Sequence, residues 1–203
     1  MGEVKSAFEK AMEKVKEIEG LTSEEKGELK DREKLRSVLA AFYRREVSAE
    51  GMWQTLKGMR LSLLREAQQN MADSLRLSNL PEELQLRAEG ILAIEALKEE
   101  QDMAAVEHSL HTIGQVQREY AEQKERAMAE LRAAVEGNPQ LRVRHVRGPD
   151  GRVLQAAMSV DEAIQMRMAE FLAEHEKRYE DMFSKVMERL KKELKAEGRP
   201  LRR

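Results

Sequence analysis

The chain has 203 residues, of which 36% are charged and only 4% aromatic, a composition typical of long helices rather than of a thick globular core. It contains no cysteine, which excludes disulfides, thiolate metal sites and cysteine nucleophiles. The net charge of −2 argues against a chain that binds polyanions over its whole surface.

The first predicted element is an amphipathic helix over residues 2–19. Its apolar side chains recur at three- and four-residue steps and therefore form one stripe. The stripe consists of Val4, Phe8, Met12, Val15 and Ile18. Such a stripe is stable only when another surface covers it, so we expect this helix to be a docking element, packed on its own chain or on a second one.

Two further helices complete an N-terminal unit, residues 1–79. Thr22 and Glu25 have the spacing of a capping box, which predicts a helix that begins there and runs to about Glu46. Ser48 predicts the start of the next helix, which we expect to continue in one piece to about Leu75. The apolar side chains Leu35, Leu39 and Phe42, followed by a short turn, loosely resemble the helical hairpins that bacteria append as oligomerisation modules.

We expect residues 80–198 to form a second unit, a long antiparallel helical hairpin. A helix start is predicted at Asn79, which is the cap, with Pro81 in an acidic first turn. We expect this helix to run unbroken to Glu136, roughly 56 residues or ~84 Å. Ser159 and Glu162 form a capping box for the last helix. That helix ends near Gly198, and we expect residues 199–203 to form a flexible tail.

A short β-hairpin is expected at residues 140–158, between the two long helices. Apolar and polar residues alternate on both sides of the turn sequence Gly148-Pro149-Asp150-Gly151, which is the pattern of two paired strands. An isolated two-stranded hairpin is marginally stable in water. We therefore interpret it as a contact point that pairs with a partner, not as a structural necessity.

Folding the last helix back about this tip matches the apolar stripes of the two long helices. The predicted register places Gln117 opposite Tyr179, Leu110 opposite Val186 and His175 near Tyr120. It also places Lys191, Lys192 and Lys195 beside Asp102, Glu100 and Glu99. The predicted fold is all-α: an elongated antiparallel helical hairpin or coiled coil, tipped by the β-hairpin and preceded by a set of shorter helices.

Catalytic and metal chemistry finds little support in the sequence. A di-iron carboxylate bundle needs Glu-x-x-His on two helices, and none of the residues three before His108, His111 and His175 is acidic. His108 and His111 could chelate a metal at helical spacing, but we interpret them as part of a polar stripe on a solvated or helix-facing surface. No glycine-rich phosphate loop or glycine-flanked serine is present. We expect no catalytic, cofactor or metal site.

Charge is unevenly distributed along the chain. Residues 82–136 carry 13 acidic and 6 basic side chains, whereas the hairpin carries Arg142, Arg144, Arg147 and Arg152 against one acid, Asp150. Nucleic acid is not expected as a partner, because the hairpin lacks aromatic side chains on which bases could stack. The arginines either protect the strand edges from aggregation or bind a protein.

The opening residues 1–6, followed by an amphipathic helix and an acidic helix start, resemble a family of uncharacterised bacterial helical proteins. That resemblance implies a bacterial protein without a known activity. Separately, the order long helix, β-hairpin, long helix over residues 81–197 is similar in topology to the subunits of prefoldin-type chaperones. No apolar run is long enough to span a membrane and the first residues lack a signal-peptide layout, so a cytoplasmic location is expected.

The sequence therefore favours a non-enzymatic coiled-coil scaffold or adaptor that forms homo-oligomers and binds a protein partner. A prefoldin-like holdase is the second hypothesis, and a metal-binding helical bundle is the third. The predicted partner-binding residues come from the first helix and the β-hairpin: Val4, Phe8, Met12, Val15, Arg142, Val143, Arg144, Arg147 and Arg152.

Overall fold

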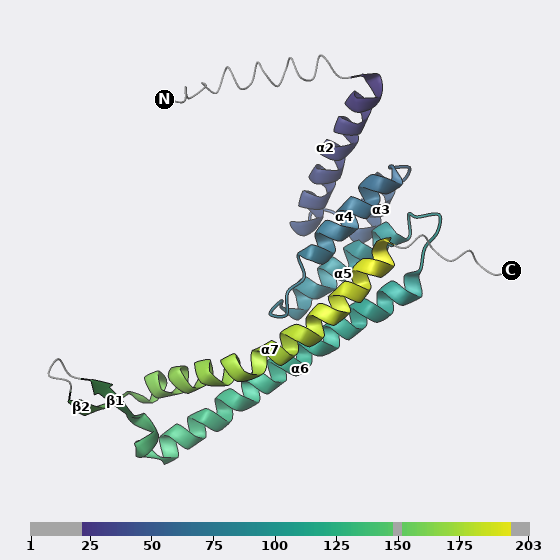
Figure 1. Ribbon diagram of the computed structural model, residues 1–203. Helices are drawn as coiled ribbons and strands as arrows, with labels where there is room; N and C mark the ends of the chain where they lie inside the picture. Colours follow the sequence, from purple (N-terminus) through teal and green to yellow (C-terminus); the bar gives the residue numbers. More distant parts are fainter. Residues whose placement is uncertain (1–21, 148–151, 196–203) are drawn as a thin grey trace, which may run out of the picture.

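The computed structural model describes residues 22–147 and 152–195, and within them the chain is mostly helical (Figure 1). The α-helices are α2 (Ser23–Tyr43), α3 (Ala49–Leu56), α4 (Leu61–Asp73), α5 (Pro81–Glu95), α6 (Met103–Gly137) and α7 (Val160–Lys195). A 3₁₀ turn, η1 (Pro139–Arg142), leads into the strands β1 (Val143–Arg147) and β2 (Val153–Ala157). None of the helices in the described ranges has the length and apolar character needed to cross a membrane.

Helix α2 begins at the predicted capping box. The Thr22 hydroxyl accepts a hydrogen bond from the Glu25 backbone, and the Glu25 carboxylate accepts one from the Thr22 amide at 2.7 Å. The helix ends with Arg45 in the left-handed region (φ 59°), where the Glu46 amide donates to the Ala41 carbonyl at 2.9 Å. Its end at Tyr43 lies close to the predicted one.

The predicted third helix is wrong in one respect, because two helices occupy its length. Helix α3 stops at Leu56, and Gly58 follows with φ 79°, the left-handed conformation that glycine adopts readily after a helix end. Helix α4 then starts at Leu61. The apolar stripe continues across the break, since Met52 and Leu56 before it and Leu63 and Met71 after it are all buried.

The predicted 56-residue helix is also broken, into α5 and α6, although residues 96–102 contain neither glycine nor proline. The cause is a buried polar cluster. The Glu95 carboxylate lies 2.6 Å from the Lys98 ammonium and accepts a hydrogen bond from the Asp102 amide at 3.1 Å. Gln68 on α4 donates to the same carboxylate at 2.9 Å. Asp102 then caps α6 through the Ala105 amide.

The start of α5 has the predicted early proline, but Leu80, not Asn79, occupies the cap position. The Asn79 side chain instead donates to the Glu83 carboxylate at 2.7 Å and accepts from the Arg76 amide at 2.6 Å. Asn79 thus stabilises the turn that precedes the helix.

Helices α6 and α7 lie side by side in antiparallel order, joined at one end by η1 and the β-hairpin (Figure 1). In the middle of the pair the predicted register is confirmed, because the Tyr120 hydroxyl donates to Glu176 at 3.0 Å. Nearer the end of α7 the pairing differs, since the Ser109 hydroxyl reaches Glu193 at 2.6 Å. There α7 also contacts α4, whose Gln69 donates to the Lys191 carbonyl.

The main hydrophobic core lies where α2–α5 meet one end of the α6/α7 pair. Its fully buried members include Phe42, Leu75, Ile91, Ile113 and Leu190. A second and much smaller cluster, Val135, Ala163 and Ile164, lies at the other end below the β-hairpin. Lys191 forms an ion pair with Asp73 of α4 at 2.5 Å, so its predicted pairing with Asp102 is wrong.

Candidate helix-binding groove

One face of α5 is fixed against the core by a glycine. A Cβ atom at Gly90 would lie 2.5 Å from the Met71 methyl carbon and 2.8 Å from the Phe42 ring, so only glycine permits this approach of α4 and α2. The adjacent face of α5 looks toward α6. Gln117 of α6 donates to the Arg76 carbonyl at 2.6 Å and thereby holds α6 at a set distance from the loop before α5.

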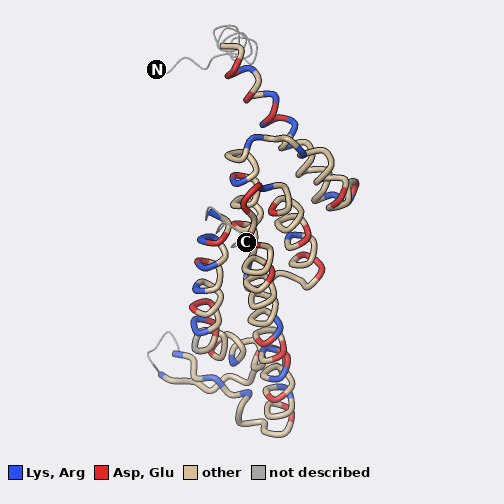
Figure 2. Tube along the Cα trace, turned by 90° about the vertical axis from the view of Figure 1, so that its right-hand side faces the viewer, with Lys and Arg blue, Asp and Glu red and all other residues tan. Residues whose placement is uncertain are grey.

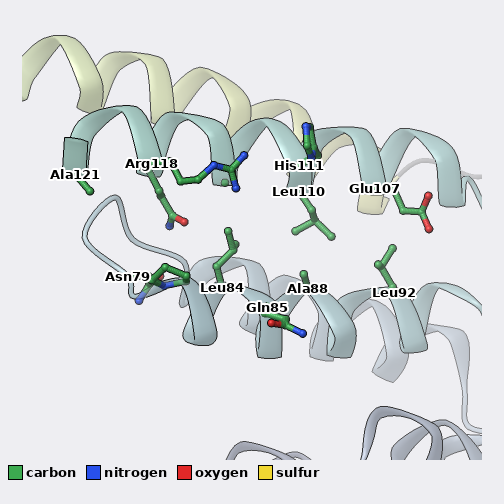
Figure 3. Close-up of a pocket in the computed structure, with 13 residues that line it drawn as sticks. Asn79, Leu84, Gln85, Ala88, Leu92, Glu107, Leu110, His111, Arg118 and Ala121 are labelled. Atoms are coloured by element: carbon green, nitrogen blue, oxygen red, sulfur yellow. The ribbon is translucent and has the colours of Figure 1, made fainter. Parts of the chain in front are cut away.

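Between α5 and α6 lies an open groove with a volume of about 480 Å³ (Figure 3). Leu84, Ala88 and Leu92 follow each other at four-residue steps along α5, and Leu110 points toward them from α6. Gly114 adds to the depth of the groove, because a Cβ atom at this position would lie 3.0 Å from the Leu84 side chain. The remaining lining residues are Asn79, Pro81, Gln85, Glu107, His111, Gln117, Arg118 and Ala121.

The groove continues into a second hollow of about 460 Å³ beside Trp53, the single tryptophan of the chain. Leu92 and Glu107 line both hollows. The Lys57 ammonium lies 5.3 Å from the centre of the Trp53 ring. The second hollow is lined by Ala49, Glu50, Trp53, Glu89, Leu92, Ala93, Met103 and Glu107.

Most of the charged residues that line this continuous groove are acidic. Glu50, Glu89 and Glu107 are all exposed and line it, and Arg118 is the basic residue among the lining side chains of the two hollows. An apolar floor between charged rims is the arrangement with which proteins bind an amphipathic helix, since the floor takes its apolar stripe and the rims pair with the flanking charges.

The β-hairpin forms as predicted, with Val143 paired to Ala157 and Val146 paired to Leu154 in antiparallel register. Val153 and Leu154 are 63% and 56% exposed. Arg144 and Arg147 lie in β1, Arg142 ends η1 and Arg152 precedes β2, so the structure gathers the predicted arginines at one end of the molecule (Figure 2). Val4, Phe8, Met12 and Val15 lie outside the described residues.

The junction of hairpin and α7 has an electrostatic signature. The Ser159 amide and hydroxyl both donate to the Glu162 carboxylate, at 2.8 and 2.9 Å, which forms the predicted capping box. The pKa of Glu162 lies below its ordinary value. The hydrogen bond from the Ser159 backbone is the largest cause, followed by the bond from the Ser159 hydroxyl and the nearby positive charge of Arg144. Arg144 therefore has a local electrostatic role besides any binding role.

His108, His111 and His175 lie on helices, and His145 lies in β1. His175 stacks on Phe171 with ring centres 4.2 Å apart, and its Nδ1 lies 3.1 Å from the Phe171 carbonyl. The Tyr120 hydroxyl donates its hydrogen bond to the neighbouring Glu176 and not to His175. Tyr120 packs against Tyr179, and its burial, with the Glu176 hydrogen bond, raises the pKa of Tyr120 to about 12. Across the described part of the chain, no three metal-ligating side chains are grouped to hold an ion.

The groove itself was not predicted from the sequence. A helix that runs unbroken from Pro81 to Glu136 cannot fold back on itself, so the faces of α5 and α6 could not be placed opposite each other. The sequence contains one signal for the groove, the small residues Ala88 and Gly114 in the middle of long helices. Small side chains permit the close approach of another backbone.

Comparison with curated proteins and with solved structures finds no match. A match to a protein family covers residues 51–196, which includes most of α3, all of α4–α7, the β-hairpin and both walls of the groove. The expected membership in an uncharacterised family is confirmed, although the match excludes the opening residues on which that expectation rested. The chain belongs to the family of unknown function DUF6657.

Proposed function

We propose that this protein is a non-enzymatic cytoplasmic scaffold or adaptor that self-associates and binds a protein partner. The observation that carries the proposal is the apolar groove between α5 and α6, which continues beside Trp53. Its α5 wall runs from Pro81 to Ala93, about 18 Å at 1.5 Å per residue, which accommodates roughly three turns of a bound helix. In helix-in-groove binding, the groove contacts the apolar side chains that recur at three- and four-residue steps along the bound helix.

The β-hairpin supplies a second contact surface in this proposal. Its two strands pair only with each other in the described structure, which leaves an outer edge on each strand. An extended segment of a partner can add to such an edge through backbone hydrogen bonds. The arginines around the hairpin favour an acidic partner segment, because they attract opposite charge and repel a second copy of the same hairpin.

The proposed scaffold is elongated, with α6 and α7 as an antiparallel coiled coil that separates the two contact surfaces. A compact chain of this length has a radius of gyration of ~17 Å. Small-angle scattering should give a clearly larger radius, since a helix of 35 residues such as α6 is about 53 Å long. A radius near the compact value would contradict the elongated shape.

Self-association is tested by light scattering of the full chain over a range of concentrations, with Trp53 emission measured on the same samples. The mass should rise to that of a dimer or a larger oligomer, and the emission should shift to shorter wavelength as the groove becomes covered. A monomer mass at every concentration, with constant emission, would refute the proposed self-association.

A prefoldin-like holdase is the second candidate, favoured by the exposed Val153 and Leu154 at the end of two long helices. A holdase would suppress the aggregation of a thermally unfolding client enzyme. Replacing both residues with serine should abolish that suppression while leaving self-association intact. Full suppression by the double variant would argue against client binding at the hairpin.

A further inference from the structure

We infer that the α5/α6 groove is filled by residues 2–19 of a second copy of this chain. The inference rests on the proposed self-association and names the segment that provides it. The predicted helix over residues 2–19 has one apolar stripe, from Val4 to Ile18, that requires a covering surface. The groove supplies an apolar floor of three α5 side chains and Leu110 that requires a covering helix.

The lengths of the two surfaces agree. Val4 and Ile18 are 14 residues apart, which corresponds to about 21 Å along a helix. The α5 wall of the groove, Pro81 to Ala93, spans about 18 Å, and the lining continues past it to Asn79. The whole apolar stripe therefore fits within the groove, with Trp53 at one end and Ala121 at the other.

Charged side chains flank the apolar surface of both the segment and the groove. On a helix of 3.6 residues per turn, Lys5 and Lys16 lie along one side of the stripe, together with Glu9 and Glu19. Lys14 lies along the other side, together with Glu3. Among the lining residues of the groove, Glu50, Glu89 and Glu107 are acidic and exposed, and Arg118 is basic and exposed. A helix that lies with its stripe on the floor brings Lys5 and Lys16 toward one rim and Lys14 toward the other, where each lysine can pair with a rim glutamate.

The geometry of α2 favours a second copy over the same chain. The C-terminal end of α2 packs on α5, where Phe42 contacts Gly90, whereas the first turns extend away from α6 (Figures 1 and 2). Helix α2 is 21 residues long, about 31 Å. Residues 20–22 can span only about 10 Å, so they cannot carry the preceding segment back along α2 to the groove.

Exchange of the segment between two chains closes both grooves at once. Each copy donates residues 2–19 and accepts the same residues from its partner, which gives a two-fold symmetric dimer. Closed symmetry of this kind stops at two chains, whereas one-way insertion would continue into a filament. The inferred oligomer is therefore a dimer.

The test mixes two full-length variants that are each defective in one half of the contact. Phe8→Ser with Met12→Ser disrupts the stripe and leaves the groove intact, and Ala88→Arg fills the groove and leaves the stripe intact. Light scattering should give each variant alone half the mass of the unaltered protein. The mixture should recover a dimer, because it contains one intact groove and one intact segment.

Matched controls separate this result from misfolding. Lys10→Ser, on the opposite side of the predicted helix, and Ala129→Arg, at an exposed position of α6, should both keep the dimer mass. Changing Glu50, Glu89 and Glu107 to lysine should also halve the mass. Adding Lys5→Glu, Lys14→Glu and Lys16→Glu to this triple variant should restore the dimer. An unfolded variant could not be restored in this way.

The outcomes distinguish the inference from the proposed function. If the mixture of the two defective variants stays monomeric, exchange between copies is refuted. If both variants keep the dimer mass of the unaltered protein, another surface mediates self-association, so the inference fails and the scaffold function stands. If the unaltered protein is itself monomeric, both the proposed self-association and the inferred exchange of residues 2–19 are refuted.

Discussion

The two ends of the α6/α7 pair are built from similar sequence but packed very differently. At the base, residues 103–120 of α6 and 183–195 of α7 join the core of α2–α5, and Ile113, Leu190 and Leu194 are fully buried. At the tip, residues 121–137 and 160–178 contact little besides each other, and the cluster there has only Val135, Ala163 and Ile164 as buried members. A shared amphipathic pattern therefore does not imply equal stability along a helix.

The difference follows from the number of elements that meet at each end. A buried side chain at the base contacts residues from several helices, and each contact adds burial energy. A side chain at the tip has one partner helix and the hairpin. We therefore expect the base to unfold only with the whole protein and the tip to open locally at a lower free energy.

The largest expected effect comes from breaking the charged cluster at the base. Lys98 lies against Glu95 at 2.6 Å, both side chains are 2% exposed, and the Lys98 ammonium also donates to the Leu194 carbonyl at 3.0 Å. Lys98→Ala leaves a buried carboxylate without its counter-charge, which typically costs about 3–5 kcal/mol. Urea denaturation monitored by circular dichroism should show this loss in the free energy of unfolding.

The double variant Glu95→Leu with Lys98→Met is the control, because it removes both charges. Replacing a buried ion pair with apolar residues of similar volume is often neutral or stabilising. A double variant as unstable as Lys98→Ala would show that the connection between α5 and α6, not the uncompensated charge, determines stability.

The next effect compares one isoleucine from each end. Ile113→Ala at the base should cost about 2–5 kcal/mol of global stability, the usual range for such a change in a packed core. Ile164→Ala at the tip should cost less in global unfolding. Hydrogen exchange should show faster exchange over residues 121–137 and 160–178 in this variant, with the base unchanged. Equal loss of protection at both ends would mean that the pair unfolds as one unit.

The base and the tip also differ in how well the sequence predicted them. At the tip the local signals suffice: the two alternating strands and the Ser159–Glu162 capping box form as expected. At the base the decisive contacts are distant in sequence. Gln68, Glu95 and Leu194 meet around Lys98, and no pattern along the chain indicates that a helix must break there to form this cluster.

The sequence contains one signal for the break after α3, a glycine. Gly58 occupies the position after the helix end where glycine is favoured, but the apolar stripe continues through it and suggested one helix. Periodicity reports which side chains face the core and does not report whether the backbone between them is continuous. The candidate groove depends on such breaks, so it could not be located before the structure.

Replacing the β-hairpin should have a smaller effect than either core substitution. A short Gly/Ser loop in place of Val143–Ala157 keeps Leu141 and Met158, which pack on the tip cluster. Because a two-stranded sheet contributes little stability by itself, the melting temperature and helicity should stay nearly unchanged while binding of an acidic partner segment is lost. Unfolding of α6 and α7 in this variant would identify the hairpin as a folding clamp and refute the contact-point interpretation.

The smallest expected effect is the pH dependence of the capping box that begins α7. Glu162 has a pKa below its ordinary value of 4.5, chiefly because the Ser159 backbone amide donates to it. A lowered pKa in the folded state means that the box stabilises the helix start above that ordinary value and loses the contribution as the pH falls through the lowered one. Hydrogen exchange at the first turn of α7, corrected for the intrinsic pH dependence, should therefore accelerate in acid. Glu162→Gln, which cannot titrate, should remove this acid-dependent step, and an unchanged step would assign it to another carboxylate.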